Sequence, residues 1–169
     1  MNIEYFVLKA DGSYNKELFE PGTAKKPGWL TEQEYQARYP YGHFAGTLED
    51  IRAEAKKQLR EKRKTVEYGG FQYSGQRWDS AEKDELRLNS MLKMFEMTGA
   101  TEFSGWKIAE GVYVTATPAL LQGAAMSLMQ HYAHAFAMEA SKIQTIEGLQ
   151  TVAEVQEWLH GGLNADWNI

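Results

Sequence analysis

A glycine- and aromatic-rich segment, residues 68–80, lies between two strongly helical runs and constrains how both can fold. Three of its residues are glycines: Gly69, Gly70 and Gly75. Glycine is favoured where the backbone must take a positive φ, and the rings of Phe71, Tyr73 and Trp78 offer apolar area to bury. The segment must therefore turn sharply, either to hold a ligand or to build the fold.

The spacing Gly70-x-x-x-x-Gly75 matches the first part of a phosphate-binding P-loop. The match ends there, because Gln76-Arg77 stand where the Lys-Ser/Thr pair would contact phosphate and Mg²⁺, and no strand precedes the segment. We therefore interpret it as a folding element. The glycine pair 69–70 ends one helix, Ser74-Gly75 reverse a short hairpin of residues 71–73 and 76–78, and Asp79-Ser80 start the next helix.

The first flanking helix is predicted to begin at the N-cap Thr47 and to bury one apolar face. That face comprises Leu48, Ile51, Ala55, Leu59 and Val66. Its other faces carry seven Lys or Arg residues against five Asp or Glu residues. A docking face for an acidic partner is one reading of these charges, and a solvated face of mixed ion pairs is the other.

The second flanking helix is predicted to run from Asp79-Ser80 to Gly99 with a broad apolar arc. The arc comprises Leu86, Leu88, Met91, Leu92, Met94, Phe95 and Met97. Its methionines favour core packing over an adaptable binding surface.

A second hairpin, 106–109 with 112–116, precedes a third helix that is capped by Thr117 and begins at Pro118. The predicted core face of that helix comprises Leu121, Ala125, Leu128, Tyr132, Ala135 and Phe136. Residues 118–138 carry no formal charge, which raises the question of a membrane span. Polar side chains such as Gln122 and His131 favour a buried helix instead.

The two ends of the chain form smaller pieces. Strands at 3–8 and 13–19, joined at Asp11-Gly12, and a short helix after the capping box Thr31-x-x-Glu34 predict an N-terminal module. At the other end, Thr151-x-x-Glu154 opens a helix that stops at Gly161-Gly162, and Trp167 in the tail is expected to dock.

These elements predict an α+β fold: helices with two short antiparallel hairpins packed on a helical core, plus a small β-containing N-terminal module. Residues 1–46 form that module, 47–145 the helix-hairpin domain, and 146–169 a C-terminal helix and tail that pack on it.

Composition excludes several classes of function. The formal charge is −5, with no global basic field, so nucleic acid is not an expected partner. The chain has no cysteine, which removes disulfides, thiolate nucleophiles and cysteine-based metal sites. The first residues lack a basic region followed by a long apolar run, so no signal peptide is predicted.

The strongest candidate for chemistry is the pair His131 and His134, one turn apart on the third helix. A pair with no intervening glutamate and largely apolar neighbours is more typical of buried or interfacial histidines than of a metal site. No nucleophile motif accompanies it. We therefore expect no enzyme activity, no cofactor and no metal.

The motif Tyr68-Gly-Gly-Phe-x-Tyr-x-Gly-x-x-Trp-Asp-Ser80, with the later Trp106-Lys and Val112-x-Val-Thr-x-Thr117, resembles a domain of unknown function of tailed bacteriophages. That domain occurs in tail-fibre assembly and other tail-associated proteins, and the resemblance spans about residues 48–143. The motif positions are Gly69, Gly70, Gly75, Trp78, Asp79 and Trp106. Trp78 stands where phenylalanine is commoner.

The resemblance implies a non-enzymatic tail protein, either a structural component of the tail or baseplate or a fibre assembly chaperone. It would be found in the virion tail or in the host cytoplasm during assembly. A trimer would match the symmetry of fibres, although no heptad pattern in the sequence requires a homo-oligomer. No contact with a membrane is expected.

Aromatic residues near residues 40–46 are candidate partner contacts, because such residues often anchor interfaces. They are Trp29, Tyr35, Tyr39, Tyr41 and Phe44. Attachment of the N-terminal module to the main domain is an equal alternative for them. A second hypothesis for function is a small binding module that targets a host protein, suggested by the charge of −5 from Gly99 onward.

Overall fold

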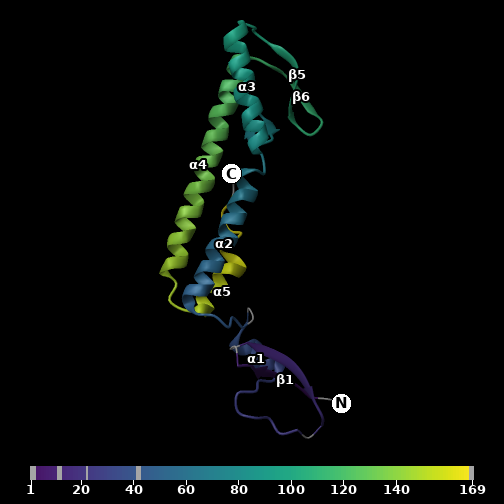
Figure 1. The fold of residues 1–169 in the computed structure, drawn as a ribbon, viewed down its shortest axis with the longest axis vertical. Coiled ribbons are helices and arrows are strands. Elements are labelled where there is room, and N and C mark those ends of the chain that lie inside the picture. Colours follow the sequence, from purple (N-terminus) through teal and green to yellow (C-terminus); the bar gives the residue numbers. More distant parts are fainter. Residues whose placement is uncertain (1–2, 11–12, 22, 41–42, 168–169) are drawn as a thin grey trace. The chain divides into compact units, whose positions relative to one another are not determined.

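The computed structural model describes the whole chain except residues 1–2, 11–12, 22, 41–42 and 168–169. The described residues form five helices and three separate two-stranded antiparallel sheets (Figure 1), which confirms the predicted α+β class. The strands are β1 (Ile3–Leu8), β2 (Tyr14–Phe19), β3 (Phe71–Tyr73), β4 (Gln76–Trp78), β5 (Phe103–Ala109) and β6 (Val112–Ala116). The helices are α1 (Glu32–Arg38), α2 (Leu48–Glu67), α3 (Glu82–Thr98), α4 (Pro118–Gly148) and α5 (Val152–Gly161).

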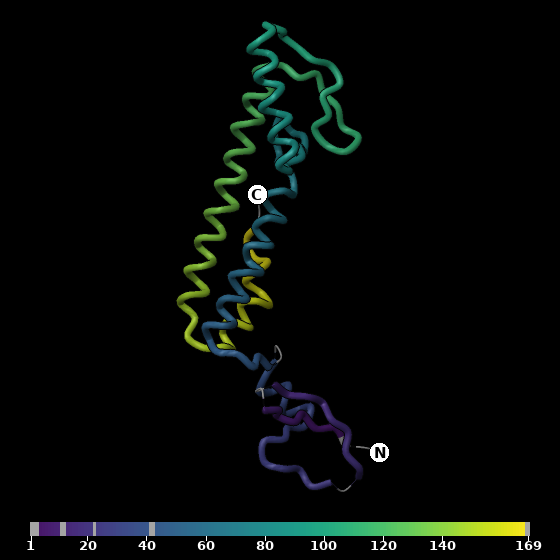
Figure 2. Tube along the Cα trace, in the orientation of Figure 1, coloured from purple at the N-terminus to yellow at the C-terminus, as the bar shows by residue number. Residues whose placement is uncertain are grey.

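The chain divides into two compact units. One unit comprises Met1–Lys57 with Gln144–Ala165, and the other comprises Gln58–Ile143 with Asp166–Ile169. The divisions fall within α2 and α4, whose course can be followed in Figure 2. The boundaries that the sequence suggested at residues 46 and 145 stay predictions.

The second unit contains a hydrophobic core formed by α3, α4 and the hairpins β3–β4 and β5–β6, which we call the inner hairpins. Its buried residues are Phe71, Trp78, Leu88, Phe95, Trp106, Ile108, Ala116, Leu121, Ala124 and Leu128. Both inner hairpins therefore pack on helices, as the sequence predicted. The backbone N–H of Asp79 also donates to the carbonyl of Ile108 at 2.7 Å, which joins β4 to β5.

Most element ends lie where local sequence signals placed them. Both capping boxes form, Thr31 with Glu34 before α1 and Thr151 with Glu154 before α5. Thr47 is reciprocally bonded to Asp50 at the start of α2, and the N–H of Leu120 donates to the Thr117 hydroxyl at 3.2 Å. Residues within one helical turn make all these contacts, which is why short motifs predict them.

The predicted start of α3 at Asp79-Ser80 is wrong by two residues. The N-cap is Ala81, whose side chain makes no capping hydrogen bond. Ser80 is fully buried and bonds backbone groups elsewhere, so its hydroxyl is not available to cap the helix.

The predicted apolar faces are wider than those that the structure buries. Within α3 only Leu88 and Phe95 are buried, while Leu86 is 63 % exposed and Met97 is 77 % exposed. Phe136, assigned to the core face of α4, is half exposed. A helix buries only the stripe that a neighbouring element covers, and neither residue type nor spacing shows how wide that neighbour is.

In the C-terminal tail, the Lys142 ammonium of α4 lies 5.8 Å from the centre of the Trp167 ring. Ile169, which the expectation of a docked tail included, lies outside the described residues. None of the described helices contains a stretch long and apolar enough to cross a membrane.

The N-terminal module contains the β1–β2 hairpin, α1 and the segment between them. The hairpin pairs Ile3 with Phe19 and Leu8 with Tyr14, so side chains alternate between its two faces. The predicted turn at Asp11-Gly12 lies outside the described residues. A backbone bridge between Phe6 and Leu30 fixes the returning chain beside β1.

Candidate functional site

The segment 68–80 forms a hydrogen-bond network with the last residues of α2 and with α4. We call this network the junction. The Ser80 hydroxyl donates to the carbonyl of Glu67 at 2.6 Å and accepts from the N–H of Gly70 at 2.8 Å. Ser80 is fully buried. The last carbonyls of a helix have no partner within the helix, and buried ones need another hydrogen bond. The Ser80 hydroxyl supplies one to the Glu67 carbonyl and also accepts from the Gly70 N–H.

Two side chains of α4 complete this junction. The Nε2 atom of His131 lies 3.0 Å from the carbonyl of Val66 and 3.2 Å from that of Glu67, so it carries the proton and donates. The Tyr132 hydroxyl donates to the carbonyl of Ser80 at 2.7 Å. Burial raises the pKa of Tyr132 to about 12, so the phenol stays protonated as the donor.

The two candidate metal ligands therefore have different surroundings. His131 is buried, with one ring nitrogen occupied by backbone carbonyls, whereas His134 is exposed. Within the described parts of the chain, no group of three or more His, Asp or Glu side chains converges as a metal site would need. His131 is a structural donor.

Arg63 connects α2 to α4 beside the junction. Its guanidinium forms ion pairs with Glu67 on its own helix and with Glu139 on α4, the latter at 2.7 Å. Each of the three side chains is at most 12 % exposed. The guanidinium also lies 4.3 Å from the ring centre of Phe136, which covers it from one side.

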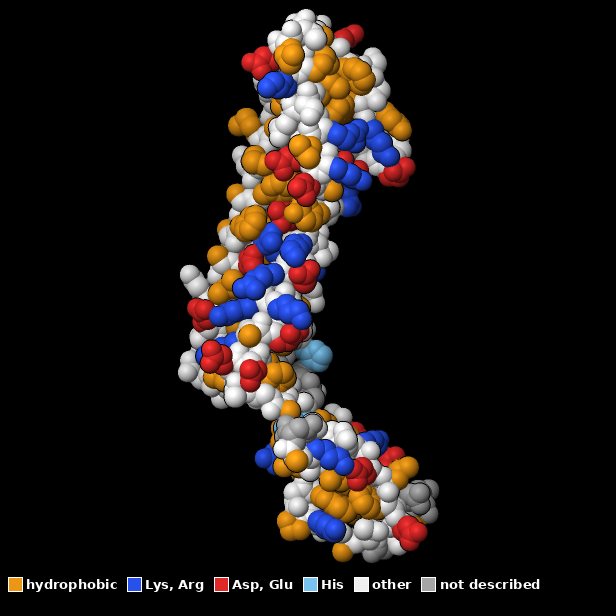
Figure 3. Space-filling view, viewed as in Figure 1, with side chains coloured by type: hydrophobic (Ala, Val, Ile, Leu, Met, Phe, Trp, Pro, Cys, Tyr) orange, Lys and Arg blue, Asp and Glu red, His pale blue; other side chains and the backbone are white. Residues whose placement is uncertain are grey.

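The basic residues of α2 are mostly engaged within the chain. Six of the seven contact acidic side chains or carbonyls: Arg52, Lys56, Lys57, Arg60, Arg63 and Lys64. Figure 3 shows basic and acidic side chains intermixed over this part of the surface. The arrangement favours the mixed ion-pair reading over a free docking face for an acidic partner.

The motif residues shape the backbone around the junction. Ser74 and Gly75 both have positive φ, +53° and +74°, which is the pattern of a two-residue hairpin turn and confirms the predicted chain reversal. Gly70 has φ +93°, and a Cβ there would lie 2.8 Å from the carbonyl oxygen of Trp78. Gly69 has no such φ, but a Cβ there would press on the carbonyl of Thr65 at 2.8 Å.

Gly123 on α4 was not singled out from the sequence, although the hairpin depends on it. A Cβ at this position would overlap the Tyr73 side chain, whose Cζ atom would be 2.6 Å away. The ring therefore lies directly on the helix backbone. A glycine inside an apolar helix is the signal that could have predicted such a close approach.

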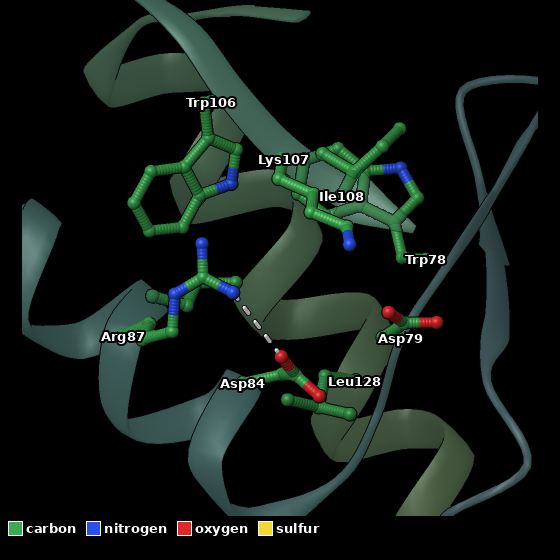
Figure 4. Close-up of a pocket in the computed structure, with 9 residues that line it drawn as sticks. Trp78, Asp79, Asp84, Arg87, Trp106, Lys107, Ile108 and Leu128 are labelled. Atoms are coloured by element: carbon green, nitrogen blue, oxygen red, sulfur yellow. Dashed lines mark hydrogen bonds and ion pairs between the residues drawn. The ribbon is translucent and has the colours of Figure 1, made fainter. Parts of the chain in front are cut away.

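A small hollow lies where the two inner hairpins meet α3 (Figure 4). In it, Arg87 extends between Trp106, whose ring centre is 5.1 Å from the guanidinium, and Asp84, at 3.4 Å. The hollow has a volume of about 20 Å³, enough for roughly one water molecule. It is a packing feature and not a ligand pocket.

The N-terminal module presents aromatic side chains on both faces of its hairpin. On one face, Trp29 stacks on Phe19 with ring centres 4.3 Å apart and contacts Tyr5 at 5.5 Å. Of these three, Tyr5 is buried and Trp29 is half-buried. These rings, together with the backbone bridge at Leu30, attach the loop before α1 to the hairpin.

On the other face, Phe6 and Tyr35 stack with ring centres 3.8 Å apart. Tyr14 contacts Tyr35 and Tyr39, each at 5.7 Å, and lies 4.9 Å from the ring of His43. Burial lowers the pKa of His43, with a smaller contribution from the nearby Arg38 charge. This face is thus a continuous layer of partly buried rings.

Three of the five predicted partner contacts pack against other rings of the module. Trp29, Tyr35 and Tyr39 belong to the two ring clusters, Phe44 is half-buried, and Tyr41 lies outside the described residues. Their packing within the module is a third role, distinct from both alternatives that the sequence suggested.

Two exposed residues of the hairpin were missed by sequence reasoning. Leu8 is 49 % exposed and Leu18 is 65 % exposed. The pairing register places both on the Phe6 face, beside the ring layer. Alternation along the strands could have revealed this, because Leu18 lies opposite Glu4. We refer to Phe6, Tyr14, Tyr35 and these two leucines as the hairpin face.

A protein-family profile, described as a domain of unknown function (DUF4376), matches residues 50–158. That range covers more than half of the chain, so the protein belongs to this family, here with an α+β fold. The match includes the junction and ends within α5, while the N-terminal module precedes it. No curated protein and no solved structure matches the chain.

Proposed function

We propose that this protein is a non-enzymatic bacteriophage tail protein, acting through protein–protein contacts as a tail-fibre-associated component or a fibre assembly chaperone. The observation that carries the proposal is the hairpin face, where a layer of partly buried rings adjoins two exposed leucines. Rigid aromatic side chains next to exposed apolar ones are typical of the anchors of protein interfaces.

The edge of β2 supports the same role. Within the described residues β2 pairs only with β1, so its other edge has backbone groups that no strand satisfies. An extended segment of a partner could pair there, with its side chains against the hairpin face.

The assignment to tailed phages rests on the resemblance of residues 68–80 to the tail-associated domain. Under this proposal the protein acts in the virion tail or in the host cytoplasm during assembly. The proposed partner is a tail fibre or another tail or baseplate protein.

Co-expression with the fibre protein encoded by the same phage tests the proposal. We expect the protein to co-purify with the fibre and to raise the yield of soluble, trimeric fibre. The variant Leu18→Glu should weaken retention about tenfold, equivalent to about 1.4 kcal/mol. Leu86→Glu is the matched control, because Leu86 is similarly exposed but lies on α3.

An equal yield of trimeric fibre with and without the protein, together with no co-purification, would refute the proposal. Mass spectrometry of purified virions then separates its two forms. A structural component remains in finished particles, whereas a chaperone is absent from them.

The alternative of a module that targets a host protein through its acidic C-terminal third has less support. Three of the acidic residues concerned already pair with lysine or arginine within the chain: Glu110, Glu139 and Glu147. Capture of a single host protein from a lysate, with no phage protein, would favour this alternative.

A further inference from the structure

Helix α4 carries two largely apolar stripes on opposite sides, each with one polar residue, His131 in the first and Gln122 in the second. The inner stripe faces the core and is buried: Leu121, Ala124, Leu128, His131 and Ala135. The outer stripe is exposed along its length: Ala119, Gln122, Met126, Met129, Ala133, Phe136 and Ala140. We call this second set the outer seam. Figure 3 shows hydrophobic side chains along the edge that α4 forms.

The outer seam has the spacing of a coiled coil, a repeat that sequence reasoning missed. Its seven positions follow one another at alternating intervals of three and four residues, and Ile143 continues the series. This repeat keeps one stripe of a helix facing a partner helix over many turns. Met126 is 67 % exposed and Met129 49 % exposed. Phe136 contacts the Arg63 guanidinium with one face of its ring, and half of the side chain is still exposed.

The charge pattern favours a second copy of the same helix as that partner. The chain has a formal charge of −5, yet no Lys, Arg, Asp or Glu lies between Pro118 and Met138. Two outer seams can therefore meet without like-charge repulsion, and neither buries an unpaired charge. A charged partner would find no complementary group on this stripe.

The order of large and small residues favours an antiparallel pair. In a parallel pair each residue meets its own copy, so Ala133 meets Ala133 one layer from two facing Phe136 rings. In the antiparallel register, Met129 faces Ala133 of the other copy. The remaining pairs are Met126 with Phe136, Gln122 with Ala140, and Ala119 with Ile143. Every alanine then opposes a larger side chain, which avoids voids.

We propose that the outer seam of α4 pairs with the outer seam of a second copy, in this antiparallel register. The helix dipoles of the two copies are then opposed, which adds a small favourable contribution. The pairing goes beyond the proposed function, because it uses α4 and none of the residues of the hairpin face.

The first test is the oligomeric state of the full chain, measured by light scattering and sedimentation equilibrium. We expect a dimer at micromolar concentration. Met129→Glu should weaken it by at least about tenfold, since the pair would bury two carboxylates against apolar side chains. His134→Glu is the matched control: it adds the same charge to an exposed position of α4 away from the seam and should leave the dimer intact.

The second test uses the absence of native cysteine. Gln122→Cys and Ala140→Cys, carrying different tags, should form a mixed disulfide when combined, because the register places these positions opposite each other. Neither variant should cross-link alone, since identical positions would be about 27 Å apart along the helix at 1.5 Å per residue.

A chain that stays monomeric would overturn the proposal. So would a dimer that Met129→Glu leaves unchanged, and so would efficient cross-linking of Gln122→Cys with itself. Circular dichroism of each variant shows whether a lost dimer reflects a lost fold. If Met129→Glu unfolds the chain, the cross-linking experiment still decides.

Discussion

Two hairpins of this protein differ in how they are stabilised. The β3–β4 hairpin has three residues per strand, yet Phe71 and Trp78 are 5 % and 3 % exposed because the hairpin packs on the core of α3 and α4. The β1–β2 hairpin has six residues per strand, yet among its described residues only Tyr5 is buried. Packing against other elements, and not strand length, therefore decides how far a hairpin is buried.

The polar contacts near the two hairpins also differ in how far they are buried. The junction that follows β3–β4 is held by buried hydrogen bonds of Ser80, His131 and Tyr132. The N-terminal module is held by rings and by exposed ion pairs, such as Lys25 with Glu34 at 2.6 Å. Exposed ion pairs contribute little, whereas a buried polar group that loses its partner costs much more. The junction is therefore held by buried polar contacts, whereas the module leaves Leu8 and Leu18 exposed.

The largest effect should come from the core. Leu121 is fully buried, and Leu121→Ala should lower the free energy of unfolding by about 2–5 kcal/mol. Leu18→Ala, the same change at an exposed position, should alter it by no more than about 0.5 kcal/mol. Urea titrations followed by circular dichroism measure both. Similar losses for the two variants would contradict the contrast between the core under β3–β4 and the exposed β1–β2 hairpin.

Removing the Ser80 hydroxyl should have the next largest effect. Ser80→Ala removes the acceptor of the partly buried Gly70 N–H and the donor to the buried Glu67 carbonyl, so we expect a loss of about 1–3 kcal/mol. Ser90→Ala, at an exposed position of α3, is the matched control and should cost almost nothing. Hydrogen exchange of the Gly70 amide, measured by NMR, should be accelerated in the first variant alone.

Substitution of Gly75 in the turn of β3–β4 should destabilise the fold because of its backbone φ and not because of a steric clash. A Cβ added at Gly75 would meet no atom within 4 Å, but φ is +74°. Gly75→Val should therefore cost about 1–3 kcal/mol in thermal or urea unfolding. Gly75→Asn should cost clearly less, because asparagine tolerates this conformation. Equal losses would show that something other than φ limits the position.

The smallest effect should be a pH dependence of the N-terminal module. The pKa of His43 is lowered from 6.5 by burial, so below about pH 6.5 the unfolded chain binds a proton that the folded module resists. Stability of the module should therefore fall as the pH drops from about 7.5 to about 5.5. NMR-detected urea titrations of the β1 and β2 amides measure this.

The variant His43→Asn removes the titrating ring and should abolish that pH difference. Persistence of the full difference in the variant would assign it to another group. The amides of β3 and β4 serve as an internal control, since they belong to the other compact unit.

Short-range features were predictable because their causes lie within a few residues. Ser74-Gly75 form the predicted turn, and α4 begins at Pro118 as predicted. Thr31 and Thr151 each form a capping box with the glutamate three positions later. The aromatic residues Trp29, Tyr35 and Tyr39 could be noted as partner candidates from the sequence, but the rings that each one contacts could not be predicted. Ring contacts depend on strand register, which brings together residues as distant in sequence as Phe6 and Tyr35.

By itself, the amino-acid sequence determined the α+β class, the order of the elements and most of their ends, because caps and turns are local chemistry. Only the tertiary structure determined which side chains at the junction and on α4 are buried and which are exposed. It buried Ser80 and His131 as backbone partners and left Met126 and Phe136 exposed. Burial depends on which element covers a face, and no local pattern carries that information.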